Sequence, residues 1–152
     1  MLAFRRGGDS RTVAKRGVAV TSASGANGVL ATISVPAGYM DLDSQLVITC
    51  DFTSGGAVGT RTITVAINDG SSTNVLVTTM SATASRGQFR IAQRGVAASQ
   101  RNTIDFVTSL TLAFTPAFNT TKTLTGAFTV TITATNPSDS VTLESYLATV
   151  YS

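Results

Sequence analysis

The residues best suited to chemistry in this sequence are two aspartates, Asp41 and Asp43, in the segment YMDLDSQ. Carboxylates at alternate positions of a loop can supply oxygen ligands to Ca²⁺. The wider pattern of a calcium-binding loop is missing, since no third acid follows and no glutamate closes the segment. Aspartate side chains also cap turns by accepting backbone hydrogen bonds, and this interpretation is the favoured one.

Groups that commonly catalyse reactions or hold metals are scarce. The chain has no histidine, which removes the commonest general base and metal ligand. Cys50 is the only cysteine, so no intrachain disulfide and no zinc site of several thiolates can form; its place in LVITCDF predicts a buried thiol. The glycine-rich segment TSGGAVGT precedes a predicted strand rather than a helix, which argues against a phosphate-binding loop. We therefore expect no enzyme activity, no metal and no cofactor.

Positive charge is concentrated at the N-terminus. The first sixteen residues hold five basic side chains and one acid, whereas the remaining residues hold six basic and seven acidic side chains. We expect residues 1–17 to form an arm that docks a folded body, residues 18–152, onto an acidic surface of another protein. A nucleic-acid tail is the alternative, and a targeting signal is disfavoured by the paired glycines and Asp9. The expected docking residues are Leu2, Phe4, Arg5, Arg6, Arg11, Lys15 and Arg16.

A second basic cluster lies within the body, in RGQFRIAQRGVAASQRN. Arg90 and Arg94 are four residues apart, so on a strand they would share a face. The cluster fits a solvated sheet face or ion pairs between subunits, with a nucleic-acid patch as the alternative. The cluster consists of Arg86, Arg90, Arg94 and Arg101.

The elements that must position these residues are strands. The chain of 152 residues has only 12% charged residues but 26 Thr and 16 Ser, and Thr suits the half-solvated surface of a sheet. Apolar and polar residues alternate in QLVITCDF, RTITVAIN and GAFTVTITAT, and no window has the spacing of an amphipathic helix. Around eight or nine strands between turn signals predict an all-β antiparallel β-sandwich. A jelly roll is favoured over an immunoglobulin-like sandwich, and no apolar run is long enough to cross a membrane.

The last predicted strand, SVTLESYLATVYS, does not alternate simply. Val141, Leu143 and Leu147 share one phase, while Tyr146, Ala148 and Val150 make the opposite phase apolar as well. A strand that is apolar on both faces either packs in the centre of a sandwich or contributes to a contact between subunits. Tyr146, Ala148 and Val150 are therefore candidates for an oligomer interface.

Four short motifs in a fixed order resemble a small β-sandwich family of tailed bacteriophages. They are a Pro-Ala-Gly loop before a strand in SVPAGYMDLDSQLVIT, the strand GTRTITVAIND, the segment FRIAQRGVAASQ and the terminal strand SDSVTLESYLATVYS. Together they span roughly residues 30–152. The resemblance implies a jelly-roll-like virion structural protein, trimeric, at a fibre tip or as a surface knob, without catalytic residues. Because nearly the whole chain is this domain, a compact piece attached through its N-terminus is expected rather than a self-standing fibre.

The expected function is therefore structural. The chain would assemble in the host bacterial cytoplasm into a homo-oligomer that decorates the capsid, neck or tail of a virion, with other virion proteins as partners and without nucleic acid or membrane insertion. The alternative is an adhesin at the tip of a tail fibre that binds a host glycan through loops 36–44 and 54–60. Its candidate ligand residues are Tyr39, Asp41 and Asp43. A glycan-degrading enzyme is a third, disfavoured hypothesis.

Overall fold

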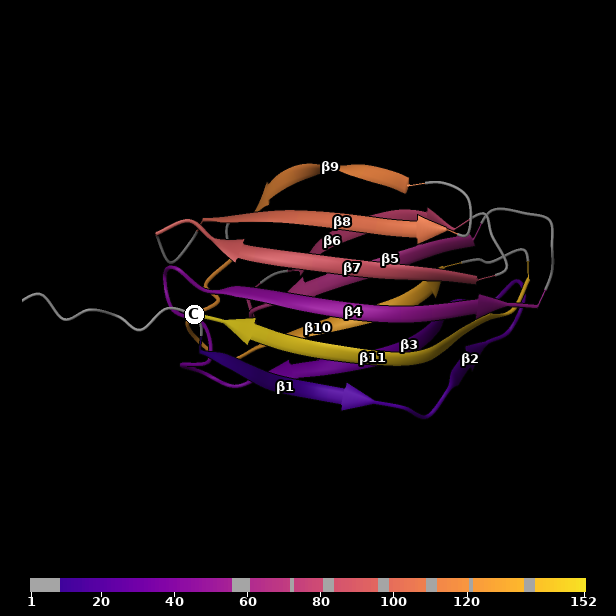
Figure 1. Cartoon of the computed structure of the whole chain (residues 1–152), viewed down its shortest axis with the longest axis horizontal. Helices are drawn as coiled ribbons and strands as arrows, with labels where there is room; N and C mark the ends of the chain where they lie inside the picture. The colour runs from indigo at the N-terminus through magenta and orange to yellow at the C-terminus, as the bar shows by residue number, and fades with distance from the viewer. Residues whose placement is uncertain are drawn as a thin grey trace, which may run out of the picture.

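The structure is a computed structural model of the chain (Figure 1). It describes residues 9–55, 61–71, 73–80, 84–95, 99–108, 112–120, 122–135 and 139–152; for residues 73–80, 84, 104–108 and 112–120 it describes the backbone alone. Its elements are β1 (Ser10–Arg16), β2 (Val20–Ser22), β3 (Gly28–Val35), β4 (Gln45–Ser54), β5 (Arg61–Asn68), β6 (Thr73–Met80), β7 (Ala84–Gln93), β8 (Gln100–Thr108), β9 (Leu112–Thr120), β10 (Phe128–Thr135) and β11 (Val141–Tyr151). Among these residues no helix is long and apolar enough to cross a membrane.

The strands form two antiparallel sheets that pack as a sandwich, which confirms the predicted fold class. The larger sheet has seven strands in the order β1-β11-β4-β7-β8-β9, with β2 also paired to β11, and the smaller has the order β3-β10-β5-β6. Along the chain, successive strands switch between the two sheets. The chain runs from β1 and β2 in the larger sheet to β3 in the smaller, then to β4, to β5 and β6, to β7, to β10 and finally to β11. This is the succession of a jelly roll, extended at one edge by the β8–β9 hairpin, and it excludes the immunoglobulin-like alternative.

The alternation of residue types explains how the sheets pack. In β5 and β10, inward Ile, Val and Ala side chains alternate with half-exposed Thr side chains. Thr is β-branched, so it suits the extended backbone while its hydroxyl faces water. Residues of both sheets meet in one core, in which Phe52 and Phe89 of the larger sheet are buried with Ile63 and Ile132 of the smaller sheet. Cys50 is a fully buried member of this core, as its sequence position predicts.

A β-bulge explains the irregular pattern of β11. The register against β4 shifts between Leu143 and Ser145, so the residues after the bulge change face. Ala148 and Val150 are fully buried in the core, and Leu147 lies on the outer face with 45% of its surface exposed. The predicted oligomer contact is therefore wrong for Ala148 and Val150, because buried side chains offer no surface to a second chain. Tyr146 is half-buried against the same core.

The N-terminal segment is also placed differently from the prediction. Ser10–Arg16 forms β1, which pairs antiparallel with β11 as the edge of the seven-stranded sheet. The boundary expected at residue 17 is therefore wrong, since residues 10–16 belong to the sandwich. A sequence argument based on charge could not find this, because Arg and Lys at a strand edge keep their charged ends in water while the backbone pairs. Leu2, Phe4, Arg5 and Arg6 lie outside the described residues.

One end of the sandwich, on the left in Figure 1, is held together by hydrogen bonds between loops that are distant in sequence. The backbone N–H of Gly38 donates to Thr125, that of Gly95 donates to Leu42, and that of Ser152 donates to Asp9. The same end carries the β5–β6 turn, the β9–β10 loop and both Asp9 and Ser152. The candidate binding site lies at this end.

Candidate functional site

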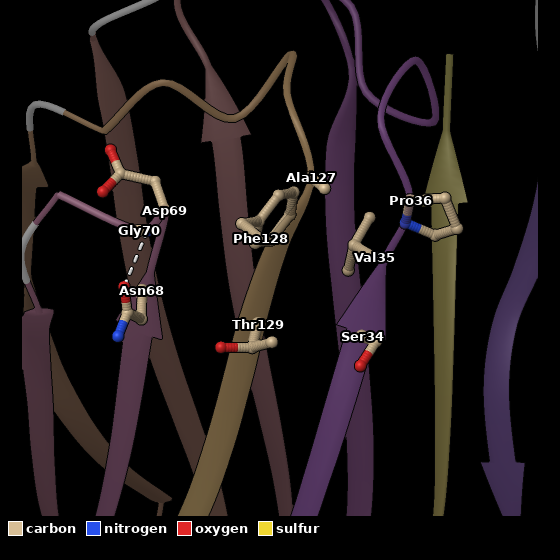
Figure 2. A pocket seen from close by; sticks show the side chains of 9 residues that line it. All are labelled: Ser34, Val35, Pro36, Asn68, Asp69, Gly70, Ala127, Phe128 and Thr129. Carbon is tan, nitrogen blue, oxygen red and sulfur yellow. Dashed lines mark hydrogen bonds between the residues drawn. The ribbon is translucent and has the colours of Figure 1, made fainter.

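A hollow of about 500 Å³ opens at this end, on the outer side of the four-stranded sheet (Figure 2). The end of β3, the β5–β6 turn and the beginning of β10 line it. The register places Thr129 of β10 between Ser34 of β3 and Asn68 of β5. Two hydroxyls and one amide therefore form a row across three strands, bordered by Pro36. Such a row can donate and accept hydrogen bonds without carrying charge.

The β5–β6 turn forms one wall of the hollow. Gly70 has a φ of 89°, a conformation that favours glycine, and its N–H donates to Oδ1 of Asn68 at 2.7 Å, which leaves the amide nitrogen as the group to meet a ligand. The carboxylate of Asp69 accepts hydrogen bonds from the backbone and hydroxyl of Ser71 at 3.1 and 2.6 Å, and from the N–H of Thr123 at 3.0 Å. Asp69 therefore acts as a structural group rather than as a ligand.

A cluster of buried polar residues supports the β5–β6 turn. The Lys122 side chain is 1% exposed, and its Nζ lies 3.5 Å from Oδ1 of Asp69. Gln100 is fully buried; its Oε1 accepts from the N–H of Lys122 at 2.7 Å, and its Nε2 donates to the Lys122 carbonyl at 2.5 Å and to Gln93 at 2.8 Å. Burying a cation is costly unless it is paired and hydrogen-bonded, and this cluster supplies both kinds of partner. It fixes the β9–β10 loop against the β5–β6 turn.

The predicted ligand residues do not line the hollow. Oδ1 of Asp41 accepts from the N–H of Asp43 at 3.0 Å and from the hydroxyl of Ser44 at 2.6 Å. This is the turn capping that the sequence favoured over calcium binding. Tyr39 is half-buried, and the guanidinium of Arg11 lies 6.0 Å from the centre of its ring. Pro36 is the residue of loop 36–44 that does border the hollow. The described residues include no group of three or more His, Cys, Asp or Glu that could hold a metal ion. Most of loop 54–60 lies outside the described residues.

The outer face of the seven-stranded sheet gathers basic residues from distant parts of the sequence. Lys15 of β1 is exposed on this face, together with Arg86 and Arg90 of β7 and Arg101 of β8. Arg94 follows the end of β7 at Gln93, and its backbone N–H donates to the carbonyl of Ser99 at 3.1 Å. The sequence indicated a basic cluster on a sheet face, but the contribution of β1 to that face was not predicted.

Two acidic residues on or beside this face are already engaged. Asp51 pairs with Arg86 at 2.8 Å and accepts from the hydroxyl of Ser145 at 3.0 Å. The hydrogen bond from Arg86 holds the pKa of Asp51 below its ordinary value of 3.8, against an opposing effect of partial burial. Glu144, at the bulge of β11, accepts a hydrogen bond from the hydroxyl of Thr53. Asp105 of β8 also lies on this face by register, so the face carries charges of both signs.

A buried ion pair lies at the opposite end of the sandwich. Arg61 is fully buried, and its guanidinium Nη2 lies 2.7 Å from Oδ2 of Asp139. The sequence analysis did not single out Arg61. A signal was available, because Arg61 shares the inward phase of Ile63 and Val65 in RTITVAIN, and an arginine in that phase must be buried with a partner.

Comparison with known proteins gives limited similarity. The sequence matches no family model, and no curated protein matches it. A solved structure with a similar fold is the CBM2 module of the evolved Dit of Lactobacillus casei BL23 phage J-1. It superposes with a TM-score of 0.46 at 8% sequence identity, covering 94% of this chain and 96% of that chain. No residue role follows from a likeness at this level.

Proposed function

We propose that this chain is a structural module of a bacteriophage virion that binds another virion protein through its N-terminal side. The order of the four phage-like sequence motifs carries the proposal. Three of them include residues of β3, β7 and β11, and the fourth includes β5, so the resemblance spans both sheets of the sandwich. A non-enzymatic role agrees with the absence of histidine from the sequence and with the structural use of Asp41 and Asp69.

The direct test is to find the protein in particles. A phage lacking the gene is grown in cells that supply the wild-type chain. The amount of this protein in purified particles is measured, and a reconstruction of the particles gives its location and copy number. Copies in multiples of sixty would mean a capsid decoration, while six, twelve or eighteen copies would mean the neck or tail. Particles that contain none of the chain would refute the proposal.

Docking by the N-terminal segment is tested by two deletions. Removal of residues 2–8 leaves β1 in place, so the variant is expected to fold with an unchanged melting temperature but to enter particles poorly. Removal of residues 2–16 also takes away β1 and exposes the edge of β11, so this second variant is expected to melt at a lower temperature. Normal incorporation of the shorter deletion would exclude Leu2, Phe4, Arg5 and Arg6 from docking.

A homotrimer is the assembly that the sequence resemblance implies. Ala148 and Val150 cannot provide its contact, so the interface must use other surfaces. Native mass spectrometry of the purified full chain measures the state directly. A monomer at micromolar concentration would remove the oligomer from the proposal and leave only docking.

The second candidate function is binding of a host glycan, and the hollow between β3, β5 and β10 favours it. Sugar hydroxyls exchange hydrogen bonds readily with neutral groups such as those of Ser34, Thr129 and Asn68. A glycan array probed with the wild-type chain and with Asn68→Ala tests it. Signal that is lost in the variant would support a glycan site, and an array without signal would argue against one.

A further inference from the structure

Lys122 and Asp69 form an ion pair that is closed off from solvent, unlike the exposed pair of Arg86 with Asp51. Their side chains are 1% and 7% exposed, and Nζ of Lys122 lies 3.5 Å from Oδ1 of Asp69. The sequence contains two lysines, and the other, Lys15, is exposed on β1. A lysine differs from an arginine because it can lose its proton when it is buried, and the neutral amine is a nucleophile. The pair therefore places a nucleophilic group beside a carboxyl group.

The two carboxylate oxygens of Asp69 have different hydrogen-bond partners. Oδ2 accepts a hydrogen bond from the backbone N–H of Thr123 at 3.0 Å. Oδ1 accepts from the hydroxyl of Ser71 at 2.6 Å and from its backbone N–H at 3.1 Å, and it is the oxygen paired with Nζ of Lys122. Oδ1 is thus placed to receive protons, whereas a negative charge that develops on Oδ2 is stabilised by a fixed backbone donor.

Burial and fixed geometry favour a reaction within this pair. Two charges held out of water retain a large desolvation penalty even when they attract each other, and a neutral product removes that penalty. The buried amide of Gln100 fixes Lys122, since it accepts from the Lys122 N–H at 2.7 Å and donates to its carbonyl at 2.5 Å. Groups held in this way react at an effective concentration of up to about 10⁵–10⁸ M. Exclusion of water from the pair also opposes hydrolysis of the product.

We propose that Lys122 and Asp69 condense into an isopeptide bond, which links the β9–β10 loop covalently to the β5–β6 turn. One proton passes from Nζ to Oδ1, which gives a neutral amine and a neutral carboxylic acid. Nζ then attacks Cγ of Asp69, and the negative charge of the tetrahedral intermediate lies on Oδ2, where the N–H of Thr123 stabilises it.

The reaction ends with the loss of one water molecule. A second proton passes from Nζ to Oδ1, directly or through the hydroxyl of Ser71, and the Cγ–Oδ1 bond breaks as Oδ1 leaves. Nζ keeps a single hydrogen, Oδ2 becomes the carbonyl oxygen of the amide, and no oxidant or reductant is needed. Ser71 is exposed, so the released water has a path to solvent. The proposal does not depend on the proposed function, because the reaction needs no group outside the chain.

Mass spectrometry of the purified full chain under denaturing conditions tests the bond directly. After prolonged incubation at neutral pH, we expect the wild-type chain to be lighter than its sequence requires by the mass of one water molecule. Trypsin should fail to cut after Lys122, and the peptide of residues 62–86 should be recovered joined through Asp69 to the peptide that contains Lys122. The matched control is Lys122→Met, whose unbranched side chain has no amine, and it should keep its full sequence mass.

Each outcome of this experiment decides the proposal. A wild-type chain that keeps its full mass would overturn it, and so would an equal loss of water from the Lys122→Met variant. Asp69 precedes Gly70, and an Asp-Gly sequence also loses water when the Gly70 nitrogen closes a succinimide ring on the Asp69 side chain. Loss of water confined to an unbranched peptide of residues 62–86 would assign it to that ring and overturn the isopeptide bond. The wild-type measurement needs no variant, so it remains decisive even if Lys122→Met does not fold.

Discussion

Arg61 shows how a single residue can be both buried and charged without being functional. Its guanidinium is sealed between the sheets, where an uncompensated charge would be costly, and Asp139 supplies the counter-charge at 2.7 Å. The pair spans from β5 to the residues just before β11, so it ties two segments that are distant in sequence. Because Arg61 is buried and paired, we expect it to contribute to the stability of the fold.

Removal of Asp139 tests that role. Asp139→Ala is expected to lower the free energy of unfolding by about 3 kcal/mol, because the buried guanidinium loses its counter-charge. Combining it with Arg61→Met should recover part of the loss, since an apolar side chain of similar length needs no partner. Urea denaturation of the two single variants and the double variant measures both effects. If the losses of unfolding free energy in the two single variants simply add up in the double variant, Arg61 and Asp139 are not energetically coupled.

Asp51 gives a prediction for pH. Its pKa is lower in the folded chain than its ordinary value of 3.8, so its contribution to stability is present above that pH. The contribution is lost as the pH falls through the lowered pKa. The pair with Arg86 is solvent-exposed, so Asp51→Asn should lower the melting temperature by at most about 4 °C at neutral pH. The difference from the wild type should shrink as the pH falls through the lowered pKa of Asp51, and thermal scans at neutral and at acidic pH measure it.

At the scale of the strand, the bulge in β11 decides which residues are inside. Ala148→Asp would place an unpaired carboxylate in the core and is expected to cost about 3 kcal/mol or more, which threatens folding. Leu147→Asp places the same group in water and should change stability by less than about 1 kcal/mol. Soluble yield and urea denaturation compare the neighbouring variants. Equal losses of unfolding free energy in Ala148→Asp and Leu147→Asp would contradict the placement of Ala148 in the core and Leu147 on the outer face.

The strand scale also separates what sequence could predict from what it could not. The alternation in β5 and β10 predicts the inward and outward faces correctly, because a period of two follows from the pleat itself. The pattern after Leu143 could not be assigned, since a bulge shifts the period by one residue and leaves no clear mark in composition. The pairing of β1 was missed for a different reason, because it depends on a partner strand more than a hundred residues away.

At the scale of the whole molecule, the sandwich brings together residues that no local pattern connects. The hollow joins Ser34, Asn68 and Thr129 through strand register, and the outer face of the seven-stranded sheet holds both Lys15 and Arg101. The sequence indicated that the N-terminus and the 86–101 segment were basic. It could not indicate that both lie on one face, because that depends on the order of strands in the sheet.

The hydrogen bond between the N–H of Ser152 and the carbonyl of Asp9 places β1 and the end of β11 side by side. A sandwich that enters and leaves at the same point can be inserted into a surface loop of another protein through two short linkers, without separating its own strands. The same geometry permits a circular permutant in which Ser152 is joined to Asp9 and new ends are opened in the β2–β3 turn. The sandwich can therefore be transferred as a unit into another protein, and binding by its two outer faces can be measured there.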